Sequence, residues 1–585
     1  YDMFGFFGKY GNDVEEYDLS LLTKDNCIYR KYSHDGLVIQ HKTLNKFLND
    51  KVFCDDEKYF FLLEGVILND DELYMRYSVN DELKSLLPYL YETEGETFWN
   101  VLRGSFSGVF YDKKNDILLV YTDHIGSKFV FYASINNTCY FSSDLKILID
   151  TLSKSTHLQY SIQFAYSMLT FGYSPNYQTI IDRIQRLPAG HYIKMQDGKM
   201  TVNKYHQFTN LPSKTSLDEN IEQLDVLFRQ ALTRILRKNE QYGYDNYMPL
   251  SAGLDSRIVT CVGNQLAKSP IYSITYSQAG YYDETIPKEI SKYLGTKMIF
   301  TALDGGEYLK KIDESVSRTC GLIHYSGPAQ VIEGVKKIDL ENVGVIATGM
   351  HGGDVVGTSF TKKSYSQKPF WGFEAYSLKL LPSLKKHLSP QFYDIYSNQE
   401  IYSLYVRGFS CANLGSPIIF QDFTESYSPF CDVDFLEFAY SIDVKQRWDH
   451  VLYDAWILKK YPEMAKWKHN GTREIGEKEY PISVFSRRIP MKSLLKRTLM
   501  FILKKTGTYN FELITNGTSM NPIDSWLRDN DSLQNYFDNY LKNNEWLLQI
   551  DKQLQADAKY LYKNGTGMEK MQVLTLLATM KNYMI

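Results

Sequence analysis

The N-terminal part of the chain alternates short apolar runs with turn-forming residues. Four such runs lie at 59–69 (YFFLLEGVILN), 103–112 (RGSFSGVFYD), 116–121 (DILLVY) and 128–132 (KFVFY). Gly, Asp and Asn punctuate them, and these residues favour tight turns. Short apolar runs bounded by turn residues predict β-strands. We therefore expect a β-rich N-terminal part.

The pattern changes near residue 216, where a helical periodicity begins. Apolar residues within 217–238 recur on one helical stripe, namely Ile221, Leu224, Leu227, Phe228, Leu232 and Ile235. Apolar segments at 247–250, 270–276 and 343–348 predict buried strands, and helical segments separate them. Strands that alternate with helices predict a parallel sheet with helices on both faces. Beyond residue 380 we expect mostly helices.

Length, charge and cysteine usage narrow the class of protein. The chain has 585 residues, which suits two to four domains of about 150 residues each. Its 65 Lys and Arg nearly balance 69 Asp and Glu, which argues against a nucleic-acid binder, because such proteins usually have a strongly basic domain. The seven cysteines form no CxxC pair, and no two histidines have the spacing of a zinc site. With no recognisable membrane span or secretory signal, we expect a cytoplasmic protein with reduced thiols.

One stretch stands out by its charge. Residues 487–505 contain seven basic residues and no acid, and apolar residues recur there at helical spacing. A basic amphipathic helix can lie on an anionic membrane surface or bind an anionic partner. A helix packed on the core with a solvated basic face has the same pattern. Both interpretations stay open at this point.

The segment most indicative of chemistry is 249–257 (PLSAGLDSR). A strand end, a turn of small residues and a helix start place backbone N–H groups and the hydroxyls of Ser251 and Ser256 where an anion can bind. Asp255 would repel phosphate unless it binds Mg²⁺, which favours carboxylate and phosphate oxygens. A simple capped connection between strand and helix would look similar. No GxxxxGK[ST] loop occurs anywhere in the chain.

The turn SAGLDS resembles the SGGxDS pyrophosphate-binding loop of the asparagine synthetase-like proteins within the ATP pyrophosphatases. Six further segments resemble motifs of that family in the same order, at 103–112, 123–128, 141–146, 187–191, 348–354 and 428–432. The resemblance covers nearly the whole chain. It implies an α/β protein that begins with a β-rich Ntn-type αββα sandwich of the glutaminase kind over residues 1–200. A doubly wound parallel-sheet ATP-pyrophosphatase domain with a helical C-terminal part would follow over 215–585, after a linker at 195–215.

The resemblance also implies a reaction and its site. In the family a substrate carboxylate attacks ATP, pyrophosphate leaves, and an amine displaces AMP to form an amide. Carried over by motif, ATP and pyrophosphate would contact Leu250, Ser251, Ala252, Gly253, Asp255, Ser256, Ile274, Gly349 and Gly353, and Asp255 and Asp354 would hold Mg²⁺. Lys468 would be the late catalytic lysine, with Lys466 as its rival. His351 would be either a base for the incoming amine or an ordinary loop residue.

The chain departs from the family where glutamine would be hydrolysed. Phe4 stands where the nucleophilic thiol belongs, and the glutamine-binding segment has no counterpart near 32–36. Glu64 replaces an amide donor of the oxyanion site, and a carboxylate cannot stabilise an oxyanion. We therefore expect an inactive glutaminase domain. In the synthetase part, Val355 and Tyr427 replace an acid and an arginine, which counts against free aspartate as the substrate.

These observations predict an AMP-forming carbon–nitrogen ligase that uses ATP and Mg²⁺ and an amine that does not come from glutamine. Its carboxylate substrate would be a small molecule or a peptide, and a homodimer stays open. The alternatives are an asparagine synthetase or glutamine-dependent amidotransferase, a lasso-type peptide cyclase, and a catalytically dead binding scaffold. Retention of both Asp255 and Asp354 argues against the scaffold.

Overall fold

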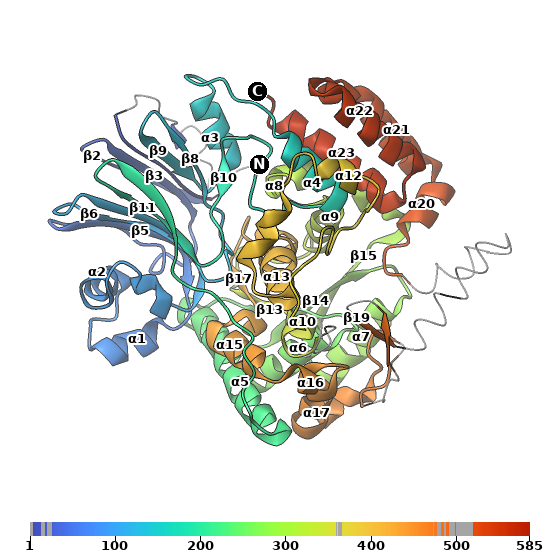
Figure 1. Ribbon diagram of the computed structural model, residues 1–585. Helices are drawn as coiled ribbons and strands as arrows, with labels where there is room; N and C mark the ends of the chain where they lie inside the picture. Colours follow the sequence, from blue (N-terminus) through green and yellow to red (C-terminus); the bar gives the residue numbers. More distant parts are fainter. Residues whose placement is uncertain are drawn as a thin grey trace.

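The computed structural model describes residues 4–12, 18–19, 26–358, 360, 365–471, 473–476, 481–484, 487–490, 498 and 519–585. Two antiparallel sheets of six strands each form the N-terminal part (Figure 1). The first sheet has the order β10 (Gln185–Arg186), β8 (Phe131–Ile135), β9 (Thr138–Ser142), β1 (Gly5–Tyr10), β3 (Leu37–Leu44) and β2 (Cys27–His34). The second has the order β12 (Lys199–Lys204), β11 (His191–Gln196), β7 (Ile117–Thr122), β6 (Gly104–Asp112), β5 (Tyr59–Ile67) and β4 (Phe53–Asp55).

Side-chain alternation along the strands explains the layers. On β5, Phe60 and Leu62 face the other sheet and pack with residues of β1, β3 and β9. Their neighbours Phe61 and Leu63 face outward and pack against α1 (Asp70–Tyr77) and α2 (Leu83–Glu94). The outer face of the first sheet packs against α3 (Leu145–Leu152) and α4 (Ile162–Phe171). The predicted αββα sandwich is confirmed.

The predicted linker at 195–215 is partly wrong. Residues up to Lys204 belong to the hairpin of β11 and β12, where Ile193 and Met195 pack between the two sheets and Tyr192 packs on the opposite face. Only the stretch from 205 to 216 connects the sandwich to α5 (Leu217–Tyr242). Ser216 and Glu219 form a capping box that starts this helix.

The second part is built on parallel strands. β13 (Asn246–Pro249), β14 (Ile271–Ser277) and β15 (Lys297–Ala302) pair in that order, with α6 (Leu254–Leu266) and α7 (Tyr282–Leu294) as crossovers. The chain then returns to the other side of β13, where β16 (Ile346–Ala347) pairs with β17 (Ser426–Tyr427). The strand order therefore reverses between β13 and β16. Such a reversal defines a doubly wound sheet and opens a crevice at the carboxyl ends of its strands.

Several short elements and connections follow the sheet. They include η3 (Asp304–Lys310), α8 (Ile312–Arg318), α9 (Ser326–Gly334), α10 (Gly352–Val355), α12 (Leu381–Leu384), η4 (Pro390–Ile395), α13 (Gln399–Tyr402), η5 (Ser403–Phe409), η6 (Ala412–Leu414), α14 (Ser416–Phe420), η7 (Pro429–Cys431), α15 (Val433–Ser441), α16 (Val444–Arg447), α17 (Val451–Lys460) and η8 (Pro462–Lys466). Among them, α9 packs on β14 and β15, α17 packs against α5, and α8 and α12 lie beside α23 and α4 (Figure 1).

The C-terminal helices are α20 (Ile523–Asp529), α21 (Asp531–Asn544), α22 (Lys552–Asn564) and α23 (Gly567–Asn582). The last helix is buried along most of its length and packs against α4 and α8, so it joins the two parts of the chain (Figure 1). The basic stretch 487–505 lies outside the described residues except for 487–490 and 498. Its first four residues form β19 (Arg487–Pro490), which pairs with β18 (Pro481–Val484). Within the described part of the chain, no helix is long and apolar enough to span a bilayer.

Candidate nucleotide site and domain junction

The loop between β13 and α6 lies at the crevice between β13 and β16. Its shape is held by its own serines, because the backbone N–H and the hydroxyl of Ser251 both lie 2.9 Å from Ser256 Oγ. The N–H of Gly253 donates to Ser251 Oγ at 3.2 Å. The start of α6 therefore points its N-terminal dipole toward the crevice, as an anion site requires.

A cavity of about 360 Å³ opens beside this loop. Its lining comes from both sides of the strand reversal and from two later segments: Pro249, Ser251, Gly253, Leu254, Asp255, Ser256, Thr348, Gly349, Met350, Gly353, Ser416, His450, Tyr453, His469 and Asn470. Gly349 is required by close approach, because a β-carbon there would lie 2.5 Å from Ser256 N. The two predicted motifs at 249–257 and 348–354 thus meet at one cavity.

Three of the residues predicted to contact the nucleotide do not line the cavity, and their backbone contacts hold the loop in place. Leu250, Ala252 and Ile274 are buried and lie outside the cavity lining. The Leu250 N–H donates to the Ile274 carbonyl at 2.8 Å, which continues the pairing of β13 with β14. The Ala252 N–H donates to Asp283 Oδ1 at 2.8 Å. These contacts position the loop backbone.

Asp255 is the acidic group of the cavity wall. Its carboxylate accepts hydrogen bonds from Tyr453 Oη at 2.8 Å and from the Gly353 N–H at 2.9 Å. Burial raises the pKa of Asp255 to about 6, and the charge of Asp354 also raises it. Asp354 follows Gly353 on α10 and is exposed.

Asp255 lines the cavity, whereas Asp354 lies outside its lining. Mg²⁺ in nucleotide sites is held by one or two carboxylates while phosphate oxygens and water complete its shell. Over the described residues, no group of three or more His, Cys, Asp or Glu side chains is arranged to hold a metal ion. A cation at Asp255 and Asp354 would therefore be held jointly by the protein and its ligand.

The structure does not bring Lys468 into the cavity. Its side chain is half exposed and lies 3.6 Å from Glu474, while its backbone carbonyl accepts a hydrogen bond from Arg257 at 3.2 Å. The rival Lys466 is exposed and pairs with Glu463. The cavity-lining residues of this segment are the next two, His469 and Asn470.

His351 lies beside the cavity wall and outside its lining. It adopts a left-handed conformation with φ of 69° and is the N-cap of α10. Its Nε2 lies 3.2 Å from Asn413 Oδ1, and burial lowers the pKa of its imidazole. Asn413 in turn donates to the Ile125 carbonyl at 3.2 Å, so His351 is connected to the sandwich.

The structure adds cavity residues that the sequence analysis did not single out. Outside the two motifs at 249–257 and 348–354, they are Ser416, His450, Tyr453, His469 and Asn470. His450 starts α17 with φ of 58°, and its ring lies 5.5 Å from that of His469. Neither histidine has a spacing that marks a site. One indication of either histidine was present in the sequence, which is that His469 directly follows the predicted catalytic residue Lys468.

The region around Glu64, where a glutamine site would be expected, is occupied by buried charged side chains. Glu64 Oε1 lies 3.3 Å from Lys51 Nζ, and Glu64 Oε2 accepts a hydrogen bond from His41 at 2.8 Å. Glu425, which precedes β17, lies 2.7 Å from Lys128 and 3.5 Å from Lys51. We call these five residues the buried charge cluster. It joins the sandwich to the parallel-sheet part.

The surroundings favour the charged forms of Glu64 and Lys51, whereas burial lowers the pKa of His41 and favours its neutral form. Burial alone would raise the pKa of Glu64, but Lys51 and His41 together hold it well below its usual range. Burial alone would lower the pKa of Lys51, but Glu64 and Glu425 raise it. The remaining cavity, bordered by Phe4, measures about 10 Å³, which is room for at most about one water molecule.

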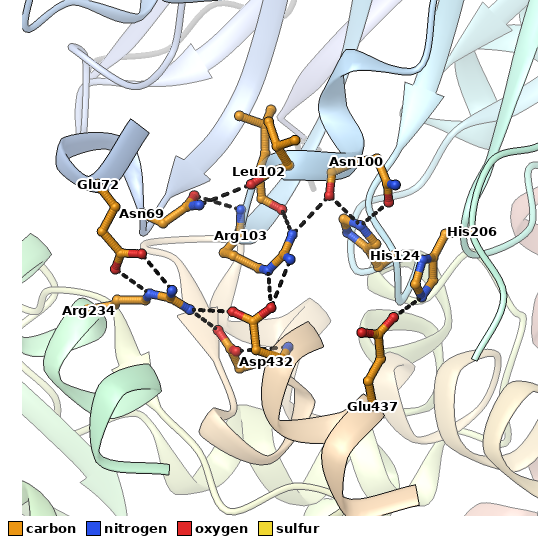
Figure 2. A network of polar contacts seen from close by, with 12 residues as sticks. Asn69, Glu72, Asn100, Leu102, Arg103, His124, His206, Arg234, Asp432 and Glu437 are labelled. Atoms are coloured by element: carbon orange, nitrogen blue, oxygen red, sulfur yellow. Dashed lines mark hydrogen bonds and ion pairs between the residues drawn. The ribbon is translucent and has the colours of Figure 1, made fainter. Parts of the chain in front are cut away.

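A second polar network closes the domain junction (Figure 2). Arg234 of α5 binds Glu72 of the sandwich through two contacts of 2.7 Å and Asp432 at 3.0 Å. Arg103 of the sandwich donates to Asp434 at 2.8 Å. Bidentate arginine pairs of this kind fix orientation as well as position.

Residues of this network belong to three of the motifs noted in the sequence, at 103–112, 123–128 and 428–432. Arg103 opens the 103–112 motif, and Asp432 ends the 428–432 motif and caps α15. In Figure 2, His124 of the 123–128 motif contacts Asn100 beside them, with Nε2 3.0 Å from Asn100 Oδ1. These motifs therefore meet at the junction between the two parts, away from the nucleotide cavity. Ser428 connects them to it through a hydrogen bond of 2.8 Å to the Met350 carbonyl.

Comparison with known proteins agrees with this division. A glutamine amidotransferase domain model matches residues 49–206, and an asparagine synthase model matches residues 223–333. Asparagine synthetase [glutamine-hydrolyzing] 1 of Bacillus subtilis (strain 168) is 23% identical over 270 residues, which are 45% of this chain and 42% of the relative. Asparagine synthetase [glutamine-hydrolyzing] 2 of the same organism is 23% identical over 390 residues, 62% of this chain and 49% of the relative.

These similarities cover part of each relative. The chain spans less than half the length of the two Bacillus subtilis synthetases. Among solved structures, a glutamine phosphoribosylpyrophosphate amidotransferase from B. subtilis, complexed with ADP and GMP, matches with 10% identity and a TM-score of 0.27. That match covers 51% of this chain and 91% of the other, and so low a score carries no argument. The two domain models and the relatives thus show a similarity to asparagine synthetases over parts of this chain, and the SAGLDS loop at the strand reversal agrees with that similarity.

Proposed function

We propose that the protein is an ATP-dependent, AMP-forming ligase that joins a carboxylate to an amine. The observation that carries this proposal is the position of the SAGLDS loop, whose hydroxyls and helix start line a cavity at the reversal of a parallel sheet. The substrate carboxylate would attack the α-phosphate of ATP, forming an acyl-adenylate and pyrophosphate. The amine would then attack the acyl carbon and release AMP.

Residues of the cavity suit the first half of this reaction. Ser251, Gly253 and Ser256 would bind the leaving pyrophosphate through hydroxyl and backbone donors. Asp255 and Asp354 would hold Mg²⁺, which when bound would neutralise charge on the phosphates. The hydrogen bond from Tyr453 would keep one carboxylate oxygen of Asp255 in a fixed orientation.

We further propose that the amine is not ammonia from glutamine. Both oxygens of Glu64 have cationic or imidazole partners, and the space beside Phe4 is too small for an amino acid. A carboxylate held ionised by Lys51 and His41 offers no hydrogen-bond donor to an oxyanion. The sandwich would then serve as a wall of the synthetase part, fixed to it by the buried charge cluster.

Tyr427 supports a carboxylate other than free aspartate. Its buried hydroxyl donates to the Cys431 carbonyl at 3.3 Å, so no cation stands at this position to bind a second carboxylate. A small acid or a side-chain carboxylate of a peptide would fit an adenylating site of this kind.

The experiment uses the full chain with Mg–ATP and a panel of carboxylates and amines. Release of pyrophosphate with AMP supports the proposal, and release of orthophosphate with ADP contradicts it. A parallel assay measures glutamate from glutamine. Glutamate formed at the rate of pyrophosphate release would contradict the proposed source of the amine and restore a glutamine-dependent enzyme.

A further inference from the structure

The segment after η8 crosses the nucleotide loop and is bonded to it. We call residues 467–471 the strap. The Asn470 N–H donates to the Ala252 carbonyl at 3.1 Å, and a β-carbon built at Gly253 would lie 3.8 Å from Asn470 Oδ1. The strap therefore lies directly against the turn that begins α6.

Arg257 determines which strap side chains face the cavity. This buried guanidinium donates to the carbonyl of Ala252 at 2.9 Å and to those of Trp467 and Lys468 at 2.7 and 3.2 Å. The Lys468 carbonyl faces Arg257, and the Lys468 side chain is 53% exposed. The next residue, His469, lines the cavity.

A second element supplies a matching imidazole. His450 lines the same cavity from the start of α17, with its ring 5.5 Å from that of His469. Its Nδ1 is buried and has no hydrogen-bond partner in the described part of the protein. A buried polar atom without a partner is unfavourable, and turning the ring so that Nδ1 faces a ligand in the cavity would supply the missing hydrogen bond.

We infer that His450 and His469, with Asn470, form the second wall of the pyrophosphate site and bind phosphate oxygens in place of the lysine expected there. The inference rests on the proposed function and deepens it. Pyrophosphate would lie between the SAGLDS loop and the histidine pair. The donors of this wall are imidazole N–H groups and one carboxamide.

The surroundings favour neutral imidazoles in these positions. Burial, His450 and nearby arginines lower the pKa of His469 to about 3, and burial and Arg473 lower the pKa of His450. A neutral imidazole still donates one N–H to an anion. The strap itself is anchored by Arg473, which binds Asp454 of α17 through contacts of 2.7 and 2.9 Å. Both histidines are therefore attached to one rigid support.

The test is equilibrium binding of Mg–pyrophosphate and Mg–ATP to the full chain by calorimetry. The variants are His469→Ala, His450→Gly, which tolerates the left-handed backbone, and the matched control Lys468→Ala. Losing a hydrogen bond to a charged group costs about 1.5–3 kcal/mol, so each histidine variant should weaken pyrophosphate binding about 10- to 100-fold. Lys468→Ala should stay within about twofold of wild type. His469→Gln, which keeps an N–H donor, should recover part of the loss.

Each outcome decides a different point. If wild type binds both ligands and the histidine variants bind them as tightly as wild type does, the inference is overturned and the proposed function stands. If wild type binds neither ligand, both fall. Far-UV circular dichroism and the thermal midpoint of each variant establish that it folds. A variant that unfolds is replaced by its Gln counterpart at the same position.

Discussion

Replacing Glu425 tests how the buried charge cluster joins the two parts of the protein. Glu425 is 2% exposed, and its carboxylate lies 2.7 Å from Lys128 and 3.5 Å from Lys51. In Glu425→Leu, Glu64 would be the one remaining carboxylate of the buried charge cluster, opposite the two cations Lys51 and Lys128. One cation of the sandwich would then remain buried against the synthetase part without its partner.

The expected magnitude follows from this geometry. Removing one partner of a buried pair costs about 3–5 kcal/mol, because the other charge stays desolvated without compensation. Lys128→Met alone should cost a similar amount, since Glu425 would keep only the more distant Lys51. The double variant should recover much of the loss, because Lys51 and Glu64 still neutralise one another. We expect a coupling free energy of about 2–3 kcal/mol between the two sites.

The assay is urea unfolding of wild type, both single variants and the double variant, followed by tryptophan fluorescence and circular dichroism. Because a chain of several domains need not unfold in one step, the first transition is compared. The control is Lys268→Met, which breaks an exposed ion pair with Glu240 and should cost less than about 1 kcal/mol. If Glu425→Leu costs no more than this control, or if the double variant is simply additive, the cluster does not join the two parts as described.

Three further predictions concern the site and its supports. Asp255→Asn and Asp354→Asn should each lower turnover at least about a hundredfold with the fold intact, because each removes a charge that would hold Mg²⁺; near-normal pyrophosphate release at limiting Mg²⁺ would contradict that role. Since the folded pKa of Glu64 is depressed, its contribution to stability is present above pH 4.5 and is lost as the pH falls below it. The difference in unfolding free energy between wild type and Glu64→Gln should therefore shrink on acidification, and a constant difference would refute the assignment. Arg257→Lys should raise the KM for ATP about tenfold, because lysine cannot bridge the loop and strap carbonyls, whereas Arg229→Lys, at a half-buried arginine that hydrogen-bonds Gln265 at the surface, should leave the KM unchanged.

The sequence by itself determined the fold class and the nucleotide loop. The short apolar run at 59–69 predicted a strand, and the helical stripe at 217–238 predicted the long helix that became α5. Both are local patterns, so they are readable without knowing the fold. The loop at 249–257 is likewise contiguous, and its serines hydrogen-bond to one another. The same locality made the replacement of the thiol by Phe4 visible.

The tertiary structure decided which side chains face the cavity and what fills the space at Glu64. His450 and His469 lie about 200 residues from the loop, and the hydrogen bonds of Arg257 and Asn470 hold the strap in a position where His469 lines the cavity and Lys468 does not. Lys128 and Glu425, 297 residues apart, become partners because the edge of the sandwich packs against β17. Such pairings depend on the packing of whole elements, which short-range periodicity does not encode. The sequence therefore does not distinguish an exposed lysine such as Lys468 from a buried one such as Lys128. The neighbours of each lysine in the folded protein determine its role.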